Sequence, residues 1–258
     1  MTTTATGGAG PRAPFGRRLA QAMETAGPLC LGVDPHPGLL RQWGLSDTPA
    51  GLEAFSLTAL EAAVGPEGPR VAAIKPQVAL YERHGSAGLA ALERLLAAAR
   101  DAGVLTIADA KRGDIGSTMD GYAAAWTSDA SPLAADAVTL SPYLGFGTLV
   151  PTIRAAHGAG RGVFVLALTS NPEGREVQHV GEGSAEGSVA RRIAAAAAAE
   201  NAALRGDDAW GPVGLVLGAT VAAEADRLGL DLPALGGPLL APGFGAQGAT
   251  ARGMRADF

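Results

Sequence analysis

The stretch VLTIADAKRGDI, residues 104–115, places a group of charges directly after a short apolar run. Residues 104–108 are mostly apolar, as in a parallel strand that helices cover on both faces of the sheet. Asp109, Lys111 and Asp114 follow at once. In α/β proteins, functional side chains gather at the carboxyl ends of parallel strands and in the loops behind them. The stretch therefore predicts an α/β fold with a functional site at this strand end.

Six further apolar runs resemble residues 104–108 and alternate with longer amphipathic or alanine-rich segments. Residues 87–102 and 188–204 are the clearest helices among these segments. Alternation of strand and helix at this spacing is typical of a parallel barrel or of a doubly wound sheet. The seven predicted strands are residues 29–33, 71–74, 104–108, 137–140, 162–168, 213–217 and 238–240.

The distribution of polar residues favours the barrel over the doubly wound sheet. Polar or glycine residues follow the runs at their carboxyl ends, where (β/α)8 barrels assemble their active sites. A doubly wound sheet usually carries a glycine-rich turn after its first strand, whereas residues 33–37 read Val-Asp-Pro-His-Pro. We therefore expect an α/β fold of the TIM (β/α)8 type. Because only seven runs are found, the barrel is expected to lack the eighth strand and the final helix at the C-terminus.

Composition and segment pattern narrow the class of protein. We expect residues 1–14 to form a flexible tail and residues 15–258 to form a single (β/α) barrel catalytic domain. Its core should be ample, since 47% of the chain is apolar. The net charge of −5 argues against a nucleic-acid partner, which requires clustered Lys and Arg. No segment approaches the roughly 20 apolar residues of a membrane span, and the first residues lack the pattern of a secretory signal. A soluble, cytoplasmic protein without a membrane partner is expected.

A second lysine joins the charges of residues 109–114. Lys75 follows the run at residues 71–74, so its side chain is expected at the same barrel mouth as Asp109 and Lys111. A structural ion-pair network is the alternative, but burying charges costs several kcal/mol per ion, and apolar residues often stabilise a fold equally well. The cluster therefore indicates catalysis. No pair of histidines has the spacing of zinc ligands, so no metal site is predicted.

Six blocks of the sequence match one enzyme family and follow its order. They are GVDP at 32–35, IKPQ at 74–77, DAKRGDIGST at 109–118, SPYLG at 141–145, TSNP at 169–172 and APGFGAQG at 241–248. Along nearly its whole length the chain resembles the orotidine 5′-phosphate decarboxylases, most of all the branch common in actinobacteria. Sugar-phosphate decarboxylases of the same suprafamily share the Asp-x-Lys-x-x-Asp motif. The DAKRGDIGST version together with KPQ is much more specific.

The resemblance implies a carboxy-lyase that decarboxylates orotidine 5′-phosphate to uridine 5′-phosphate in de novo pyrimidine biosynthesis, with neither metal nor cofactor. It also implies an obligate homodimer, because Asp114 would reach into the site of the neighbouring subunit. Lys111 would donate the proton to the product. The residues implied as catalytic are Lys75, Asp109, Lys111 and Asp114.

Substrate-binding residues follow from the same resemblance. Asp34 would bind a ribose hydroxyl, Ser170 would bind the pyrimidine ring, and Thr118 would lie near the shared site. The glycine-rich loop after the seventh run could hold the phosphate with its backbone N–H groups, although an ordinary tight turn is the alternative on sequence alone. The loop residues implied in phosphate binding are Gly243, Gly245, Gln247 and Gly248.

Two alternative functions stay open at this point. A metal-dependent sugar-phosphate decarboxylase or aldolase of the same suprafamily would need a carboxylate where this chain has Lys75. A non-catalytic nucleotide-phosphate-binding paralogue would follow from loss of the C-terminal strand, where the family has a phosphate-binding arginine. Arg252 and Arg255 lie too close to the glycine-rich loop to be assigned to that role. The four intact charges favour the decarboxylase over both.

Overall fold

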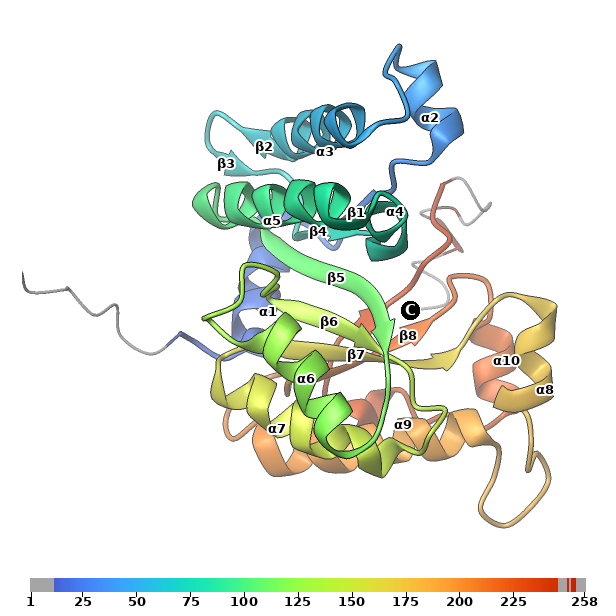
Figure 1. The fold of residues 1–258 in the computed structure, drawn as a ribbon. Coiled ribbons are helices and arrows are strands. Elements are labelled where there is room, and N and C mark those ends of the chain that lie inside the picture. The colour runs from blue at the N-terminus through green and yellow to red at the C-terminus, as the bar shows by residue number, and fades with distance from the viewer. Residues whose placement is uncertain (1–11, 246–249, 251, 254–258) are drawn as a thin grey trace, which may run out of the picture.

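The computed structural model describes residues 12–245, 250, 252 and 253, and the chain there forms a curled sheet of seven parallel strands covered by helices (Figure 1). The strand order is β1-β4-β5-β6-β7-β8-β9, so each strand of this sheet pairs with the next one along the chain. A separate two-stranded hairpin pairs β2 with β3. The strands are β1 Cys30–Val33, β2 Val64–Gly65, β3 Gly68–Pro69, β4 Ala73–Pro76, β5 Leu105–Arg112, β6 Ala137–Leu140, β7 Gly162–Leu168, β8 Val213–Leu217 and β9 Leu239–Leu240.

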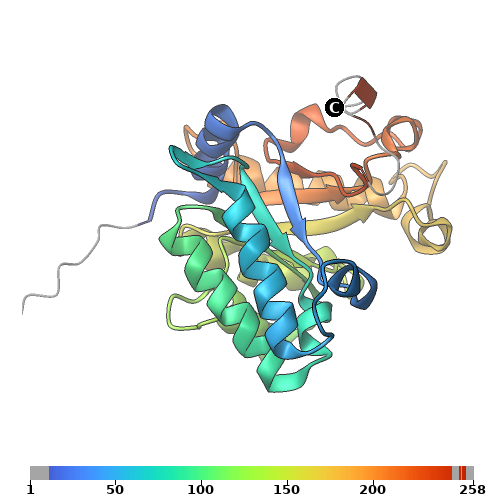
Figure 2. The ribbon, with the colours of Figure 1, turned by 90° about the horizontal axis from the view of Figure 1, so that it is seen from above.

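Helices follow most strands and lie on the outer face of the sheet. Helix α5 packs on β5, α7 on β7, and α9 on both β7 and β8. Helices α3 and α5 lie side by side on this outer face (Figure 2). The helices are α1 Phe15–Ala26, α2 Pro37–Gln42, α3 Pro49–Ala63, α4 Val78–Glu82, α5 Gly85–Asp101, α6 Gly116–Thr127, α7 Val150–Gly158, α8 Arg175–Gln178, α9 Val189–Leu204 and α10 Ala222–Arg227. None of the helices in the described residues is long and apolar enough to cross a membrane.

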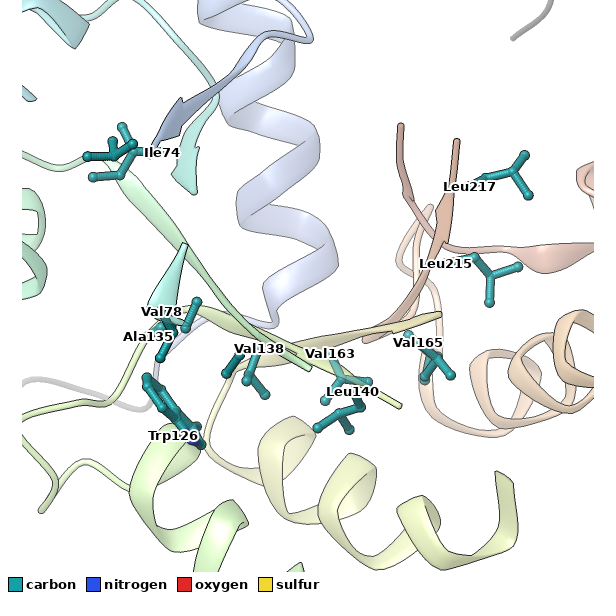
Figure 3. Packing of buried hydrophobic residues seen from close by; sticks show 14 of the residues in the cluster. Ile74, Val78, Trp126, Ala135, Val138, Leu140, Val163, Val165, Leu215 and Leu217 are labelled. Atoms are coloured by element: carbon teal, nitrogen blue, oxygen red, sulfur yellow. The ribbon is translucent and has the colours of Figure 1, made fainter. Parts of the chain in front are cut away.

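The main core lies between the strands and the outer helices. Every residue of β6 and β8 is buried, which explains why these runs are almost continuously apolar. Figure 3 shows Val138, Leu140, Val163 and Val165 between the sheet and the helices that cover it. Alternate residues of the same strands point to the inner face, because successive side chains of a strand lie on opposite sides.

Helix α1 closes the amino-terminal end of the curled sheet. Its Phe15 and Leu19 pack in a second cluster with inner-face residues such as Ile107 and Phe164. The rings of Phe15 and Phe164 meet edge to face with centroids 6.0 Å apart. Gly162 permits this approach, because a Cβ there would clash with the Phe15 ring. With this end filled by apolar side chains, the carboxyl ends of the strands are left for polar ones.

The prediction of an α/β barrel with seven strands is confirmed in the described residues, with clearly shifted bounds for two of the strands. The strand predicted at residues 71–74 is β4 Ala73–Pro76, so Lys75 lies within it and not after it. The larger difference is in β5. The strand was predicted to end at residue 108, but it continues to Arg112 and contains Asp109 and Lys111. The charged residues looked like a loop because they lack apolar character, whereas backbone pairing with β6 carries the strand past them. The β2–β3 hairpin was not predicted, since strands of two residues leave no periodic pattern.

The proposed division into a tail and one domain stays a prediction. Residues 1–11 of the tail lie outside the described residues. Arg12, also assigned to the tail, donates a hydrogen bond of 2.9 Å to the carbonyl oxygen of Ala159 and forms an ion pair with Asp129.

Candidate active site

A cluster of four charged side chains, Asp34, Lys75, Asp109 and Lys111, lies at the carboxyl ends of β1, β4 and β5. Asp109 is buried at its centre. Its Oδ2 accepts a hydrogen bond of 2.9 Å from Lys75 Nζ, and its Oδ1 accepts one of 2.5 Å from Lys111 Nζ. Lys75 Nζ also lies 3.9 Å from Asp34 Oδ1. The structure therefore brings together four of the residues that the sequence predicted for the site.

Two uncharged side chains complete the surroundings of Asp109. Gln77 Nε2 donates a hydrogen bond of 3.0 Å to Asp109 Oδ2, and Thr139 Oγ1 donates one of 3.0 Å to Asp109 Oδ1. Each carboxylate oxygen thus accepts one charged and one neutral donor. Gln77 was part of a quoted motif without a role, and Thr139 was missed. The available signal for Thr139 was a polar residue inside the apolar run at residues 137–140.

Strand parity explains why these side chains meet. Ala73, Ile107 and Ala137 belong to the inner cluster beside α1. Residues two positions further along each strand lie on the same inner face, closer to the carboxyl end. Those residues are Lys75, Asp109 and Thr139.

The backbone around Lys111 is irregular, and it separates two adjacent cations. Lys111 has φ +49°, the only positive φ of a non-glycine residue among the described ones. Its neighbour Arg112 points away from the cluster, over the rings of Tyr122 and Trp126 and onto Glu82. Gly113 then passes close to the Ser141 carbonyl oxygen, where a Cβ would clash. The pairing of β5 with β6 shifts register between Ala108 and Arg112, which marks a β-bulge. The bulge directs Lys111, and not Arg112, toward Asp109.

Electrostatic interactions keep Lys75 and Asp109 charged. Burial alone would lower the pKa of Lys75, but the carboxylates of Asp109 and Asp34 outweigh it and raise that pKa above the ordinary value. Burial alone would raise the pKa of Asp109, but Lys75 and Lys111 hold it below the usual value. The whole chain contains only two lysines, and both belong to this cluster. The arrangement presents a fixed ammonium group beside a buried carboxylate at neutral pH.

The remaining predicted residues lie around the cluster without joining it. Asp114 follows β5, and its Oδ1 accepts a hydrogen bond of 2.8 Å from the Ile115 N–H, with no ion pair to another described residue. Thr118 is exposed on α6. Ser170 is exposed after β7, and its backbone passes beside Gly218 at the end of β8. Their predicted roles toward substrate and partner subunit stay predictions.

The predicted phosphate loop follows β9 at the same end of the sheet. Its carbonyl group at Pro242 accepts a hydrogen bond of 2.8 Å from the Ala219 N–H, which ties the loop to the end of β8. Gly243 and Gly245 have φ values of +124° and +80°, conformations that side chains disfavour. Gln247 and Gly248 lie outside the described residues. In the described part of the chain, no group of three or more His, Cys, Asp or Glu side chains is arranged to hold a metal ion.

A curled parallel sheet with charges at its carboxyl ends defines an enzyme of the TIM-barrel class. The chain belongs to the orotidine 5′-phosphate decarboxylase / HUMPS family, whose model matches residues 27–257. A Streptomyces coelicolor protein named orotidine 5′-phosphate decarboxylase is 53% identical over 237 residues, which are 92% of this chain and 81% of that protein. A protein of the same name from Salinispora arenicola is 51% identical over 95% of this chain and 84% of its own length.

Solved structures give the same result. A crystal structure from Streptomyces avermitilis, described as an orotidine 5′-phosphate decarboxylase, has a TM-score of 0.87 at 51% identity. The match covers 96% of this chain and 83% of the Streptomyces chain. The structure of Leishmania donovani UMP synthase has a TM-score of 0.73 at 30% identity, covering 95% of this chain and 48% of the synthase. The predicted family resemblance is confirmed.

The lowered pKa of Asp109 leads to a prediction about stability in acid. A carboxyl group whose pKa is lower in the folded state stabilises the fold above its unfolded pKa of about 3.9, and this stabilisation is lost as pH falls through the folded pKa. Below pH 4, the unfolding free energy of the wild type should therefore fall more steeply than that of Asp109→Asn, by up to about 1.4 kcal/mol per pH unit. Urea unfolding at several pH values measures both slopes, and parallel slopes would show that Asp109 is not held ionised.

Proposed function

We propose that this chain decarboxylates orotidine 5′-phosphate to uridine 5′-phosphate in pyrimidine biosynthesis, in the cytoplasm and without metal or cofactor. The observation that carries the proposal is the contact of Lys75 and Lys111 with opposite oxygens of the buried Asp109. Relatives about half identical to this chain carry the name of this enzyme. The cluster also suits the chemistry, because the reaction builds negative charge on a ring carbon.

Lys111 has the central chemical role. When the bond between the ring carbon and the carboxylate breaks, carbon dioxide leaves and the electron pair stays on the ring carbon. No carbonyl group of the ring delocalises that pair well, so fixed positive charge must stabilise it. Lys111 supplies an ammonium group there and then transfers one of its protons to the carbon. Its partly exposed side chain, 45% accessible, can contact a ligand at the mouth of the sheet.

Asp109 and Lys75 prepare the site for this step. Asp109 would lie near the departing carboxylate and repel it, so that the repulsion falls as carbon dioxide forms. The Oδ1 contact orients Lys111, and the Oδ2 contact keeps Asp109 ionised through Lys75. Asp34, whose Oδ1 lies 3.9 Å from Lys75 Nζ, would accept a hydrogen bond from a ribose hydroxyl.

Binding of the remote groups completes the proposal. Ser170 after β7 would bind the pyrimidine ring, and the loop with Gly243, Gly245, Gln247 and Gly248 would bind the phosphate. Binding energy at the phosphate would fix the ring against the charged cluster, so a substrate without phosphate should lose turnover as well as affinity.

A homodimer with a shared site is also part of the proposal. Asp114 finds no cation among the described residues of its own chain, although it lies just beyond the cluster. Ile115, Tyr143 and Leu144 surround this end of β5 and β6 with exposed apolar surface, Tyr143 being 78% accessible. Exposed apolar patches of this kind favour a protein interface. Burying them against a second subunit would bring Asp114 and Thr118 toward the partner's cluster.

The purified chain should consume orotidine 5′-phosphate with a loss of ultraviolet absorbance, at an unchanged rate after treatment with EDTA. No step assigned to the cluster uses a metal ion, so chelation has nothing to remove. Turnover that stops on chelation and returns with a divalent cation would support the metal-dependent relatives of the suprafamily. Tight binding of uridine 5′-phosphate without any turnover would support a non-catalytic binding protein.

A further inference from the structure

We propose that Thr139 is a positioning residue that sets the place of Lys111 for proton transfer. The inference rests on the proposed function. It starts from one hydroxyl group with two bonds: Thr139 Oγ1 accepts a hydrogen bond of 2.9 Å from the Lys111 backbone N–H and donates one of 3.0 Å to Asp109 Oδ1. The same Oδ1 accepts the Lys111 ammonium at 2.5 Å. Thr139 therefore holds Lys111 at its backbone directly and at its side chain through Asp109.

The strand pairing shows why Lys111 needs this support. Ala108 of β5 faces Val138 of β6, and Arg112 faces Leu140, so residues 109–111 lie opposite Thr139 alone. Such a bulge removes regular ladder hydrogen bonds and bends the strand. The Thr139 hydroxyl takes the place of a backbone acceptor for the Lys111 N–H. It thereby stabilises the left-handed conformation of Lys111, which a residue with a side chain adopts only when its surroundings impose it.

The buried position of Thr139 restricts where its hydroxyl group can point. The residue is 1% accessible, and its neighbours in β6 are all buried. A β-branched side chain in a strand is restricted in its first torsion, so the hydroxyl is held toward β5. The single hydroxyl proton is used on Asp109, which leaves the lone pairs for the Lys111 N–H. A hydroxyl is therefore needed here, and a methyl group of the same size cannot replace it.

The two oxygens of Asp109 separate this role from that of Lys75. Thr139 and Lys111 contact Oδ1, whereas Lys75 and Gln77 contact Oδ2. Loss of the Thr139 hydroxyl should therefore release the Lys111 side of the cluster and leave Lys75 in place. Since Lys111 acts in the transition state, the loss should appear in kcat and not in KM.

Thr139→Val tests the proposal, because valine keeps the shape and removes the hydroxyl. We expect kcat for orotidine 5′-phosphate to fall by about 10- to 100-fold, as for a displaced catalytic group. KM and the affinity for uridine 5′-phosphate should change by less than about threefold, since no ribose or phosphate contact is altered. Thr139→Ser keeps the hydroxyl and should restore most of kcat.

Thr106→Val is the matched control. Like Thr139 of β6, Thr106 of β5 is a buried threonine, 3% accessible, and its hydroxyl likewise bridges a carboxylate and a backbone N–H. Both bonds go to Asp136 at the amino-terminal end of the sheet, remote from the cluster. A comparable loss of thermal stability with unchanged kcat is expected for Thr106→Val. Equal losses of kcat in the two variants would reduce Thr139 to a structural role and overturn the proposal.

The two lysines give a second readout that does not depend on turnover. In protein labelled with carbon-13 at the lysine Cε, only two side-chain signals are expected, and Lys75→Arg assigns them. Thr139→Val should shift the Lys111 signal and leave that of Lys75 nearly unchanged. An unmoved Lys111 signal, or full kcat in Thr139→Val, would refute the positioning role while leaving the proposed reaction intact. An inactive wild type would instead refute the reaction. If Thr139→Val does not fold, Thr139→Ala against Thr139→Ser gives the same comparison.

Discussion

Replacing Lys111 with alanine is expected to lower kcat for orotidine 5′-phosphate by at least about 10³-fold. The variant loses the proposed proton donor, which is also the ammonium group proposed to stabilise the developing carbanion. These effects are worth about 10²–10⁴ and 10²–10³ when removed singly. The fold should persist, because the Lys111 side chain is partly exposed and Asp109 keeps its bonds to Lys75, Gln77 and Thr139. Ultraviolet assays and thermal unfolding of the same preparation measure both effects.

Two matched variants sharpen this experiment. Lys111→Arg keeps the positive charge but gives up its proton far less readily, so it should remain strongly impaired. Arg112→Ala removes the adjacent cation, whose guanidinium group lies over the rings of Tyr122 and Trp126, away from the cluster. It should lower thermal stability with little effect on kcat. Near-normal turnover by Lys111→Ala would show that another group donates the proton.

Replacing Asp114 with alanine is expected to reduce kcat by about 10²-fold or more, although the cluster within the chain stays complete. In the proposed dimer this carboxylate acts in the neighbouring site, where it adds a preorganised charge. The distinctive test is complementation. A heterodimer of one Lys111→Ala and one Asp114→Ala subunit has one site with both substitutions and one site with neither.

Such heterodimers, isolated through two different affinity tags, should recover roughly half of the wild-type activity per dimer, as symmetry requires. Each homodimer alone should stay impaired. Heterodimers that form but remain inactive would place Asp114 in the site of its own chain. A protein that stays monomeric at assay concentrations would remove the shared site altogether.

The sequence predicted the fold well where burial alone determines the pattern. The runs at residues 137–140, 162–168 and 213–217 match β6, β7 and β8, because strands buried on both faces must be apolar almost throughout. Lys75, Asp109 and Lys111 were predicted to meet because parallel strands end at the same edge. That prediction needed no detail of side-chain packing, and the ion pairs confirm it.

What the sequence did not reveal depends on contacts between strands. Thr139 looked like an ordinary β-branched strand residue. Its hydroxyl donates a hydrogen bond to Asp109 only because β5 forms a bulge opposite it. The positive φ of Lys111 has no local signal either, since the usual residue for that conformation is glycine. The proposed role of Asp114 involves a second subunit, so the contacts within one chain do not reveal it.

The most direct test of the central claim follows the departing carboxylate itself. Orotidine 5′-phosphate labelled with carbon-14 in that carboxylate, incubated with the purified chain and EDTA, should release labelled carbon dioxide and uridine 5′-phosphate in equal amounts. The Lys111→Ala protein at the same concentration should release almost none in that time. Substrate that binds to the folded wild type but keeps its label would contradict the account.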